Sequence, residues 1–136
     1  MNTDSARQTL TTRFTTQWPT LQPTYAWFIE GGAEPDLTTQ KTPFVNFKVS
    51  LPRATQGNLS KTPMKRYTGF LEVGIFVPKG QGTKPFTVMM DTLVSLFAVQ
   101  VISGIRMRDA VPVERQPAVG WQARAVLIEY SFDSIT

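Results

Sequence analysis

The chain of 136 residues has a formal net charge of +4 and contains neither cysteine nor histidine. Without cysteine it has no disulfides, thiolate metal sites or thiol nucleophiles, and without histidine it lacks the usual general base near neutral pH and the commonest metal ligand. We therefore expect a single domain over residues 1–136 that buries a core without covalent staples and has no catalytic residues, metal or cofactor.

Basic residues are concentrated in the middle of the chain. The segment 41–84 contains eight of them and one acid, Glu72, which gives it a charge of +7, whereas the remainder carries −3. This asymmetry predicts a polarised molecule with one basic region and a mildly acidic remainder.

The ends and apolar runs of the chain bear on its location. The segment MNTDSARQTL lacks the apolar centre of a signal peptide. No apolar run approaches the length of about 18 residues that is typical of a transmembrane helix. We expect a soluble protein that is made in a cytoplasm and has no membrane contact.

Residues 4–17 are predicted to form a helix, because apolar residues recur there every four positions. Ser5 and Gln8 have the spacing of a capping box, in which two side chains satisfy free backbone groups at a helix start. Pro19 is expected to end the helix, since proline has no amide hydrogen to donate. The apolar stripe consists of Ala6, Leu10 and Phe14.

Alternating apolar and polar residues predict strands in the first half of the chain. The aromatic segment 24–29 is expected to form a short strand, and 44–51 and 67–77 are expected to form longer strands with one buried face each. The polar connector 52–66 predicts a long hairpin, whose loop of about 15 residues is longer than compact domains usually contain. The buried face of segment 44–51 is predicted to comprise Val45, Phe47, Val49 and Leu51.

The second half of the chain is predicted to contain one helix, at about 85–98, and two strands. Thr83 is expected to cap the helix, with Pro85 in the first turn, where a missing N–H costs nothing. A short strand over GIRMRDAV leads into a loop at 110–118. The final strand, 119–132, would exceed about 40 Å in length, which predicts a bulge or bend. In the short strand, Ile105 and Met107 are expected to face inward, and Arg106 and Arg108 outward.

These elements follow one another in the order α-β-β-β-α-β-β. Such an order predicts an α+β domain in which two helices cover one face of a mainly antiparallel sheet. We find no internal repeat or interdomain linker in the sequence.

None of the short motifs fits an enzyme or a metal site. In KGQGTKPF, the glycines Gly80 and Gly82 have neither Walker A nor dinucleotide-binding spacing, so a strand-to-helix turn is expected. The loop that carries Glu30, Glu34 and Asp36 lacks the order of a calcium-binding loop, and we expect it to be solvated.

Two further acids, Glu72 and Glu129, lie within predicted strands. Acids at such positions more often face solvent or form cross-strand ion pairs than act as general acids. We expect them to face solvent or to pair with Arg124 or Lys48.

The basic hairpin carries the strongest functional signal. Its lysines and arginines are residue types that contact phosphates, and Tyr67 and Phe70 have rings that can stack on bases, although the alternation places the aromatic side chains of these strands in the core. Three interpretations are open: a solvated hairpin, a nucleic-acid contact, or a contact with an acidic protein surface. The basic residues concerned are Arg53, Lys61, Lys65 and Arg66.

A series of features extends over nearly the whole chain: LTTRFTTQWPTLQP at the end of a helix, the strand YAWFI, the basic hairpin, KRYTGFLEVGIFVPKGQG, the helix FTVMMDTLVSLFAVQ and the strand GWQARAVLIEYSF. The most specific part is an R-x-x-G, strand, P-x-G-x-G, helix arrangement that begins with Arg66 and Gly69 and includes Asp91, Leu93 and Phe97 in the helix. In this arrangement the chain resembles the tail terminator proteins of long-tailed bacteriophages, of the lambda gene-product-U type. The segment AWFIEGGAEPDL departs from the family pattern, which places a short Asn-containing turn there.

The resemblance implies a non-enzymatic structural protein of the virion tail or neck, assembled in the host cytoplasm. Tail terminators form hexameric rings on the end of a finished tail tube, stop the addition of tube protein, and present a docking surface to the head–tail connector or stopper protein. Genomic DNA passes through the ring. On this basis, the candidate residues for protein interfaces or for the lumen are Arg53, Lys61, Lys65, Arg66, Lys79, Arg106 and Arg108.

Two alternatives stay open on the sequence. One is a small nucleic-acid-binding module that uses the basic hairpin 53–66, for which DNA binding should depend on salt and weaken when Lys61, Lys65 and Arg66 become alanine. The other is a different neck or tail-tube protein of the same fold.

Overall fold

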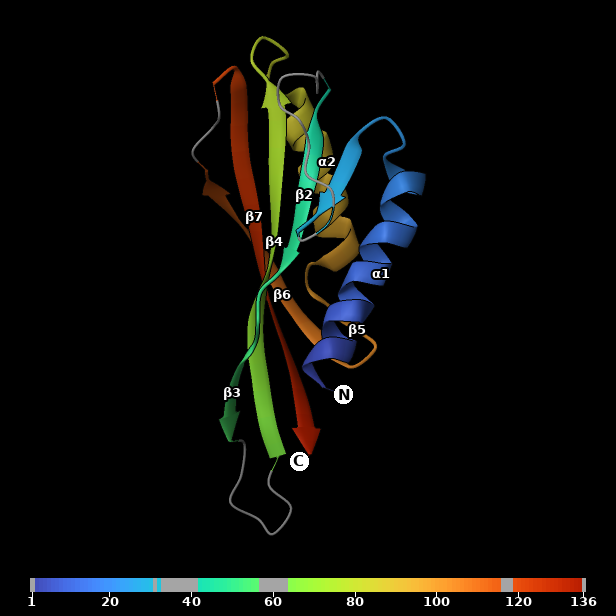
Figure 1. The fold of residues 1–136 in the computed structure, drawn as a ribbon, viewed down its shortest axis with the longest axis vertical. Helices are drawn as coiled ribbons and strands as arrows, with labels where there is room; N and C mark the ends of the chain where they lie inside the picture. The colour runs from blue at the N-terminus through green and yellow to red at the C-terminus, as the bar shows by residue number, and fades with distance from the viewer. Residues whose placement is uncertain (1, 31, 33–41, 57–63, 116–118, 136) are drawn as a thin grey trace.

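The computed structural model describes residues 2–30, 32, 42–56, 64–115 and 119–135. In these residues two α-helices pack on one face of a curled, mostly antiparallel sheet of seven strands (Figure 1). The predicted α+β class and the position of both helices on one face are therefore confirmed. The observed order is α1-β1-β2-β3-β4-α2-β5-β6-β7, which adds β3 and β5 to the predicted order.

Helix α1 (Thr3–Leu21) begins earlier than its apolar stripe predicted. The capping box is formed by Asn2 and Ser5 rather than by Ser5 and Gln8. Asn2 Oδ1 accepts a hydrogen bond of 2.8 Å from the Ser5 amide, and Ser5 Oγ accepts one of 3.0 Å from the Asn2 amide. Both side chains thus satisfy backbone donors that a helix start leaves free.

The same helix also continues beyond Pro19, so the prediction that this proline ends it was wrong. Trp18 is fully buried and stacks on Phe14, with 5.5 Å between the ring centroids. The Trp18 carbonyl also accepts a hydrogen bond of 2.7 Å from the Gln22 amide. Because this packing holds the last turn in place, it outweighs the hydrogen bond that Pro19 cannot make.

The sheet has the strand order β1-β2-β4-β7-β6-β5, and β3 pairs with β4 on the same side as β2. At its centre, β4 and β7 form an antiparallel ladder from Met64↔Ile135 to Pro78↔Trp121 without a break in register. The pair β1–β2 is parallel. The strands are β1 (Ala26–Ile29), β2 (Phe44–Val49), β3 (Arg53–Gln56), β4 (Met64–Pro78), β5 (Gln100–Ile102), β6 (Ile105–Glu114) and β7 (Trp121–Ile135).

The connector predicted over 52–66 is partly a strand. Strand β3 forms there because the first residues of β4 provide a partner ladder, from Arg53↔Thr68 to Gln56↔Lys65. Strand β2 ends at Val49, and Leu51, which was predicted to be buried, is 91% exposed between β2 and β3.

Strand β6 extends to Glu114 and so replaces part of the loop predicted over 110–118. The bulge predicted for the final strand is absent from the β4–β7 ladder, whose register is unbroken; a register shift occurs instead in β6, between Met107 and Ala110. Strand β5 reaches β6 through a two-residue turn in which Ser103 has φ 49° and Gly104 φ 86°, the left-handed values of a tight hairpin.

Helix α2 (Lys84–Phe97) has Thr83 at its N-cap position and Pro85 in the first turn, as predicted, but the Thr83 side chain makes no capping hydrogen bond. The preceding turn contains Gly80 and Gly82, whose φ values of 92° and 78° are accessible to glycine at little cost.

The core lies between the two helices and the inner face of the sheet, which is the face that they cover. Phe14 of α1 stacks on Phe47 of β2, with 4.5 Å between the ring centroids. The inward positions of Ile105 and Met107 are confirmed, and Arg106 and Arg108 are exposed. Further buried residues of this core are Leu10, Trp18, Leu71, Val73, Ile75, Phe86, Met89, Leu93, Phe97, Val126, Ile128 and Tyr130.

Three strands extend beyond the helices at one end of the molecule (Figure 1). They are β3, the first part of β4 up to Thr68, and the last part of β7 from Ser131. We call this three-stranded extension the arm. Tyr67 and Phe132 of the arm still face the core, where they stack on each other.

Candidate interaction surface

The sheet face opposite the helices, which we call the outer face, carries most of the exposed functional groups. The register of β4 and β7 determines which residues point to it: Phe70 lies beside Glu129, Glu72 beside Leu127, and Gly74 beside Ala125. Along this face, an aromatic cluster, an apolar hollow and a group of charged side chains follow one another towards the arm.

The rings of the aromatic cluster pack against one another and shield one another from solvent. Phe44 stacks on Phe76, with 4.8 Å between the ring centroids, and meets Trp121 edge-on at 5.3 Å. Phe28 contacts the other side of Phe44 at 5.4 Å. Because Phe44 and Trp121 are almost fully buried, this end of the outer face offers little apolar surface to a partner.

Arg115 follows β6, but its side chain reaches across β7 to β4. One guanidinium nitrogen lies 3.3 Å from Glu72 Oε1, and the guanidinium carbon lies 5.4 Å from the Phe76 ring centroid. The crossing is open because Gly74 and its ladder neighbour Ala125 present little or no side chain to it. Arg115 therefore separates the aromatic cluster from the middle of the outer face.

The middle of the outer face contains a hollow of about 410 Å³. Phe70 is 48% exposed and Val111 56% exposed, so the hollow presents apolar surface to solvent. Arg108 and Glu129 lie on it as an ion pair, with 3.7 Å between Nε and Oε2. We call it the β6 hollow; its lining residues are Phe70, Arg108, Asp109, Val111, Leu127 and Glu129.

On the arm, the Asp133 carboxylate is shared by two guanidinium groups, those of Arg66 and of Arg106 in the adjoining strand β6. Asp133 Oδ1 lies 3.0 Å from Arg66 Nε, and Arg106 contacts both Asp133 oxygens, at 3.2 and 3.3 Å. The hydrogen bond from Arg66, followed by that from Arg106, lowers the pKa of Asp133, and the same contact with Asp133 raises the pKa of Arg66. The cluster carries one net positive charge at neutral pH.

The junction between the arm and the body of the domain is tightly built. The Tyr130 hydroxyl donates a hydrogen bond of 2.8 Å to the Ser50 carbonyl, and burial raises the pKa of Tyr130 to about 12. Ser50 Oγ accepts a hydrogen bond of 2.8 Å from the Phe70 amide. These contacts fix the chain where β2 passes into β3.

The residues selected from the sequence do not form one cluster. Arg66 and Arg106 are brought together by Asp133, whereas Arg108 lies at the β6 hollow. Arg53 and Lys65 are exposed on the arm. Lys79 lies at the opposite end of β4, where its amide donates to the Gly120 carbonyl at 2.9 Å. Lys61 lies outside the described residues, as do Glu34 and Asp36 of the acidic loop.

The expected partners of the strand acids differ from those observed. Glu129 pairs with Arg108 and Glu72 with Arg115, rather than with Arg124 or Lys48. Lys48 lies 3.8 Å from Glu30, and the guanidinium carbon of Arg124 lies 4.9 Å from the Phe86 ring centroid.

Sequence reasoning missed the apolar part of the surface. Tyr67 faces inward and stacks on Phe132 at 5.1 Å, as the alternation predicts, but Phe70 is on the outer face and half exposed. Val111 and Val113 fell in a segment predicted to be mostly loop. Their two-residue spacing was the available signal, and it was masked by Pro112 between them.

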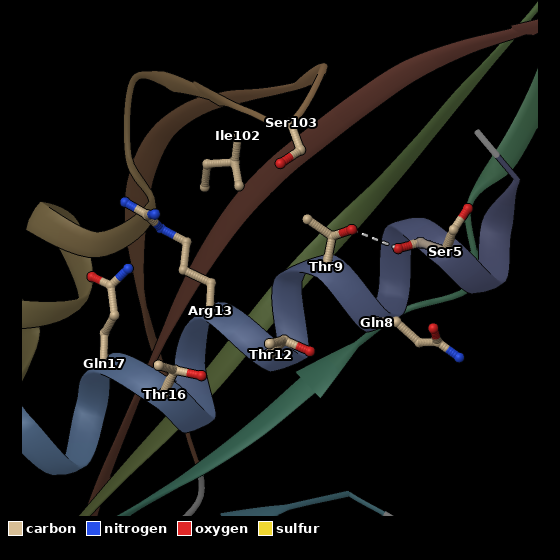
Figure 2. Close-up of a pocket in the computed structure, with 9 residues that line it drawn as sticks. All are labelled: Ser5, Gln8, Thr9, Thr12, Arg13, Thr16, Gln17, Ile102 and Ser103. Carbon is tan, nitrogen blue, oxygen red and sulfur yellow. Dashed lines mark hydrogen bonds between the residues drawn. The ribbon is translucent and has the colours of Figure 1, made fainter.

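A second and more open hollow, of about 550 Å³, lies between α1 and the β5–β6 turn (Figure 2). The cation that lines it, Arg13 of α1, bonds to α2 and β5. Its Nε donates a hydrogen bond of 2.7 Å to the Leu96 carbonyl, and another guanidinium nitrogen donates one of 3.1 Å to Gln100 Oε1. The other lining side chains are largely hydroxyls and amides, including Thr9, Thr12 and Gln17. This arrangement links α1 to the end of α2.

Two further observations concern the described part of the chain. No three acidic side chains there lie close enough together to hold a metal ion. Neither α1 nor α2 combines the length and the apolar character needed to cross a bilayer.

Comparison with protein-family models gave no match for the sequence. Comparison with curated proteins gave none either. The fold does match solved structures: one protein of known structure, whose name states no activity or partner, aligns with 100% of this chain and 96% of its own, with a TM-score of 0.65 and 16% sequence identity. The α+β fold of this chain is therefore shared over its whole length with a solved protein.

Proposed function

We propose that the protein is a non-enzymatic tail terminator, which forms a hexameric ring on the tail tube, stops tube polymerisation and offers a docking surface to the head connector. The observation that carries the proposal is the basic arm, which extends beyond the helices next to an exposed outer face. A subunit of a ring needs surfaces that are left free by its own fold, and this domain has them. The resemblance of the sequence to tail terminators supports the same function.

The charge of the arm suits contacts between proteins. Arg53 and Lys65 are exposed there, whereas Arg66 and Arg106 are held by Asp133. An exposed basic surface steers association with an acidic neighbour, such as the tube end, the connector or another subunit.

A nucleic-acid-binding module is less well supported by the same residues. Single-stranded nucleic acid is usually bound by aromatic rings that are free to stack on bases, next to cations that are free to contact phosphates. On the arm, the Tyr67 ring is stacked on Phe132, and the guanidinium of Arg66 is engaged by Asp133. A loose contact with DNA that passes through the ring is compatible with this arrangement.

The first test is the state of the purified protein. Light scattering over a range of concentrations, with negative-stain images of the same samples, should show six-membered rings with a central hole. Added to growing tail tubes of the phage that encodes the chain, the protein should stop their elongation. Monomers that leave tube length unchanged and bind DNA in a salt-dependent manner would contradict the proposal and favour the nucleic-acid-binding module.

Substitutions on the arm add a matched comparison. Arg53→Ala and Lys65→Ala should fold normally and impair tube capping or connector docking. Lys84→Ala removes an exposed cation from the first residue of α2, which follows the other end of β4, and should preserve both activities. Equal loss in all three variants would argue against a specific role of the arm.

A further inference from the structure

We infer that the β6 hollow binds the root of the arm of a second copy of this chain, with Leu51 in the hollow and Arg53 beside Asp109. The inference rests on the proposed function in one respect, since it supplies the contact between neighbouring subunits of the ring. It is argued from four observations on two surfaces of the domain, which adjoin where Ser50 is bonded to Phe70.

The hollow has the shape and lining of a site for an apolar side chain. Its walls are Phe70, Val111 and Leu127, and the first two are about half exposed in the isolated chain. Val113, two positions further along β6, adds exposed apolar surface beside it. Burial of these groups against a partner would remove apolar area from water.

Leu51 has the properties of the missing occupant. It is 91% exposed, although it lies at the junction that Tyr130 and Ser50 fix to the body of the domain. A large apolar side chain held outward by a rigid junction loses little conformational entropy when it enters a partner. Leu51 does not line the β6 hollow of its own chain, so it fills such a hollow only in another copy.

The charges beside the two surfaces are complementary. At β6, Arg108 is paired with Glu129 and Arg115 with Glu72, whereas the exposed Asp109 forms no salt bridge among the described residues. The Asp109 carboxylate is oriented by a 2.8 Å hydrogen bond that it accepts from the Ala110 amide.

The root of the arm has the opposite character. Arg53 is exposed two positions after Leu51, and Lys65 is exposed on the neighbouring strand. Arg66, Arg106 and Asp133 add one more net positive charge. A basic root that meets an acidic hollow gives the contact its orientation, because root against root or hollow against hollow would bring like charges together.

The contact joins two different surfaces of the same molecule. Each copy offers one root and one hollow. Two copies that exchanged roots reciprocally would stop at a dimer, so the ring of the proposed function requires each root to enter the hollow of the next copy, and this contact repeats until the ring closes. The contact also places Phe70 of β4, whose amide is bonded to Ser50 at the junction, within the interface.

Cross-linking tests the contact directly, because the natural chain contains no cysteine. We would place single cysteines on the two surfaces, by Ala54→Cys on the arm and Val113→Cys beside the hollow, and treat the proteins with a short bis-maleimide. The double variant should yield a ladder of linked oligomers. An equimolar mixture of the single variants should yield a heterodimer and nothing larger, and each single variant alone should yield almost none. Absence of the ladder, or equally rapid linkage within a single variant, would overturn the inference.

Two further variants distinguish a specific contact from random collision. Leu51→Ser should reduce the yield of the ladder about tenfold, as expected for the loss of one buried leucine. Val119→Ser is the matched control, since Val119 is fully exposed just before β7, and should leave the yield unchanged. Equal effects of the two substitutions would contradict the role of Leu51.

A charge exchange tests the proposed pairing of Arg53 with Asp109. Arg53→Glu should weaken cross-linking, and Arg53→Glu combined with Asp109→Arg should restore it. Failure of the combined variant to exceed Arg53→Glu would remove Asp109 from the interface. Tube capping is measured separately: variants that link but never stop tube growth would refute the terminator function alone, and capping without linkage would refute this contact alone.

Discussion

The Tyr130 ring lies directly over the backbone of Gly69, its ladder partner, so closely that a Cβ on Gly69 would come within 2.7 Å of the ring. Tyr130 is buried and its hydroxyl is bonded to Ser50, so the ring cannot move aside freely. This packing joins β4, β7 and the end of β2 at the base of the arm.

Gly69→Ala should therefore destabilise the protein by about 1–3 kcal/mol, the usual cost of overpacking a filled site. Chemical denaturation would measure the change. Gly74→Ala is the matched control in the same strand and should cost less: its new Cβ would lie 2.7 Å from the flexible end of Arg115, which can move away, and 3.0 Å from the Phe76 ring, which needs only a small shift. If both alanines are tolerated equally, the packing of Tyr130 on Gly69 is not a constraint.

Stability should decrease at alkaline pH because of Tyr130. An unfolded tyrosine ionises near pH 10, whereas burial raises the pKa of Tyr130 to about 12. Between these values the native state retains a proton that the unfolded state has lost, so the free energy of unfolding falls as pH rises. Denaturation at a series of pH values would show this slope, and Tyr130→Phe should flatten it while costing about 1 kcal/mol at neutral pH through the lost hydrogen bond.

Asp133→Asn should make the arm bind DNA more strongly. The substitution removes the negative charge between Arg66 and Arg106, so the positive potential that attracts phosphates rises there. Fluorescence anisotropy of a labelled duplex at several salt concentrations would measure the gain and its salt dependence. Asp91→Asn makes the same charge change at an exposed position of α2 and should have a smaller effect. An unchanged affinity in Asp133→Asn would show that the arm does not contact nucleic acid in this way.

The contacts of Asp133 also predict an acid effect. Because they lower its pKa, they stabilise the native state above the ordinary pKa of aspartate and are lost as pH falls through the lowered value. Asp133→Asn should therefore be less sensitive to acid than the natural protein when unfolding is followed from neutral pH downwards. Parallel acid profiles of the two proteins would contradict this prediction.

Pro19→Ala should stabilise the protein by about 1 kcal/mol. The alanine would supply the backbone donor that helix α1 lacks in its last turns, where Pro19 interrupts the hydrogen-bonding pattern. Thermal unfolding would measure the change. Pro23→Ala, beyond the end of the helix, should give no such gain because it restores no helical hydrogen bond. A loss of stability in Pro19→Ala would indicate that the packing of the proline ring contributes more to stability than the regained hydrogen bond.

Hydrophobic periodicity was sufficient to predict which face of each main helix or strand is buried. Apolar residues at every second position, Val45 and Phe47 in one strand and Ile105 and Met107 in another, identified the buried face of each strand, because only one face packs against the helices. It failed at Leu51, since alternation does not reveal that a strand has ended. It failed at Pro19 as well, because the burial of Trp18 is a tertiary effect.

The surface was less accessible to sequence reasoning than the fold. Arg66, Arg106 and Asp133 meet only because β4 and β6 are both neighbours of β7, and no local pattern specifies that neighbourhood. The basic character of the arm could be predicted, whereas the hollow could not, since it is assembled from three strands. Val111 became part of it because β6 continues past its bulge.

The central ladder also has a consequence for biosynthesis. Its pairs join positions 43 residues apart at one end, Pro78 with Trp121, and 71 apart at the other, Met64 with Ile135. Such high contact order slows folding, because loop closure must precede any gain from pairing. When β4 leaves the ribosome, its partner β7 has not yet been translated. The backbone hydrogen-bonding groups along one edge of β4 therefore stay unpaired during the synthesis of α2, β5 and β6. Nascent chains that stall in this interval should be the aggregation-prone species, and the arm should be completed only after β7 has been released.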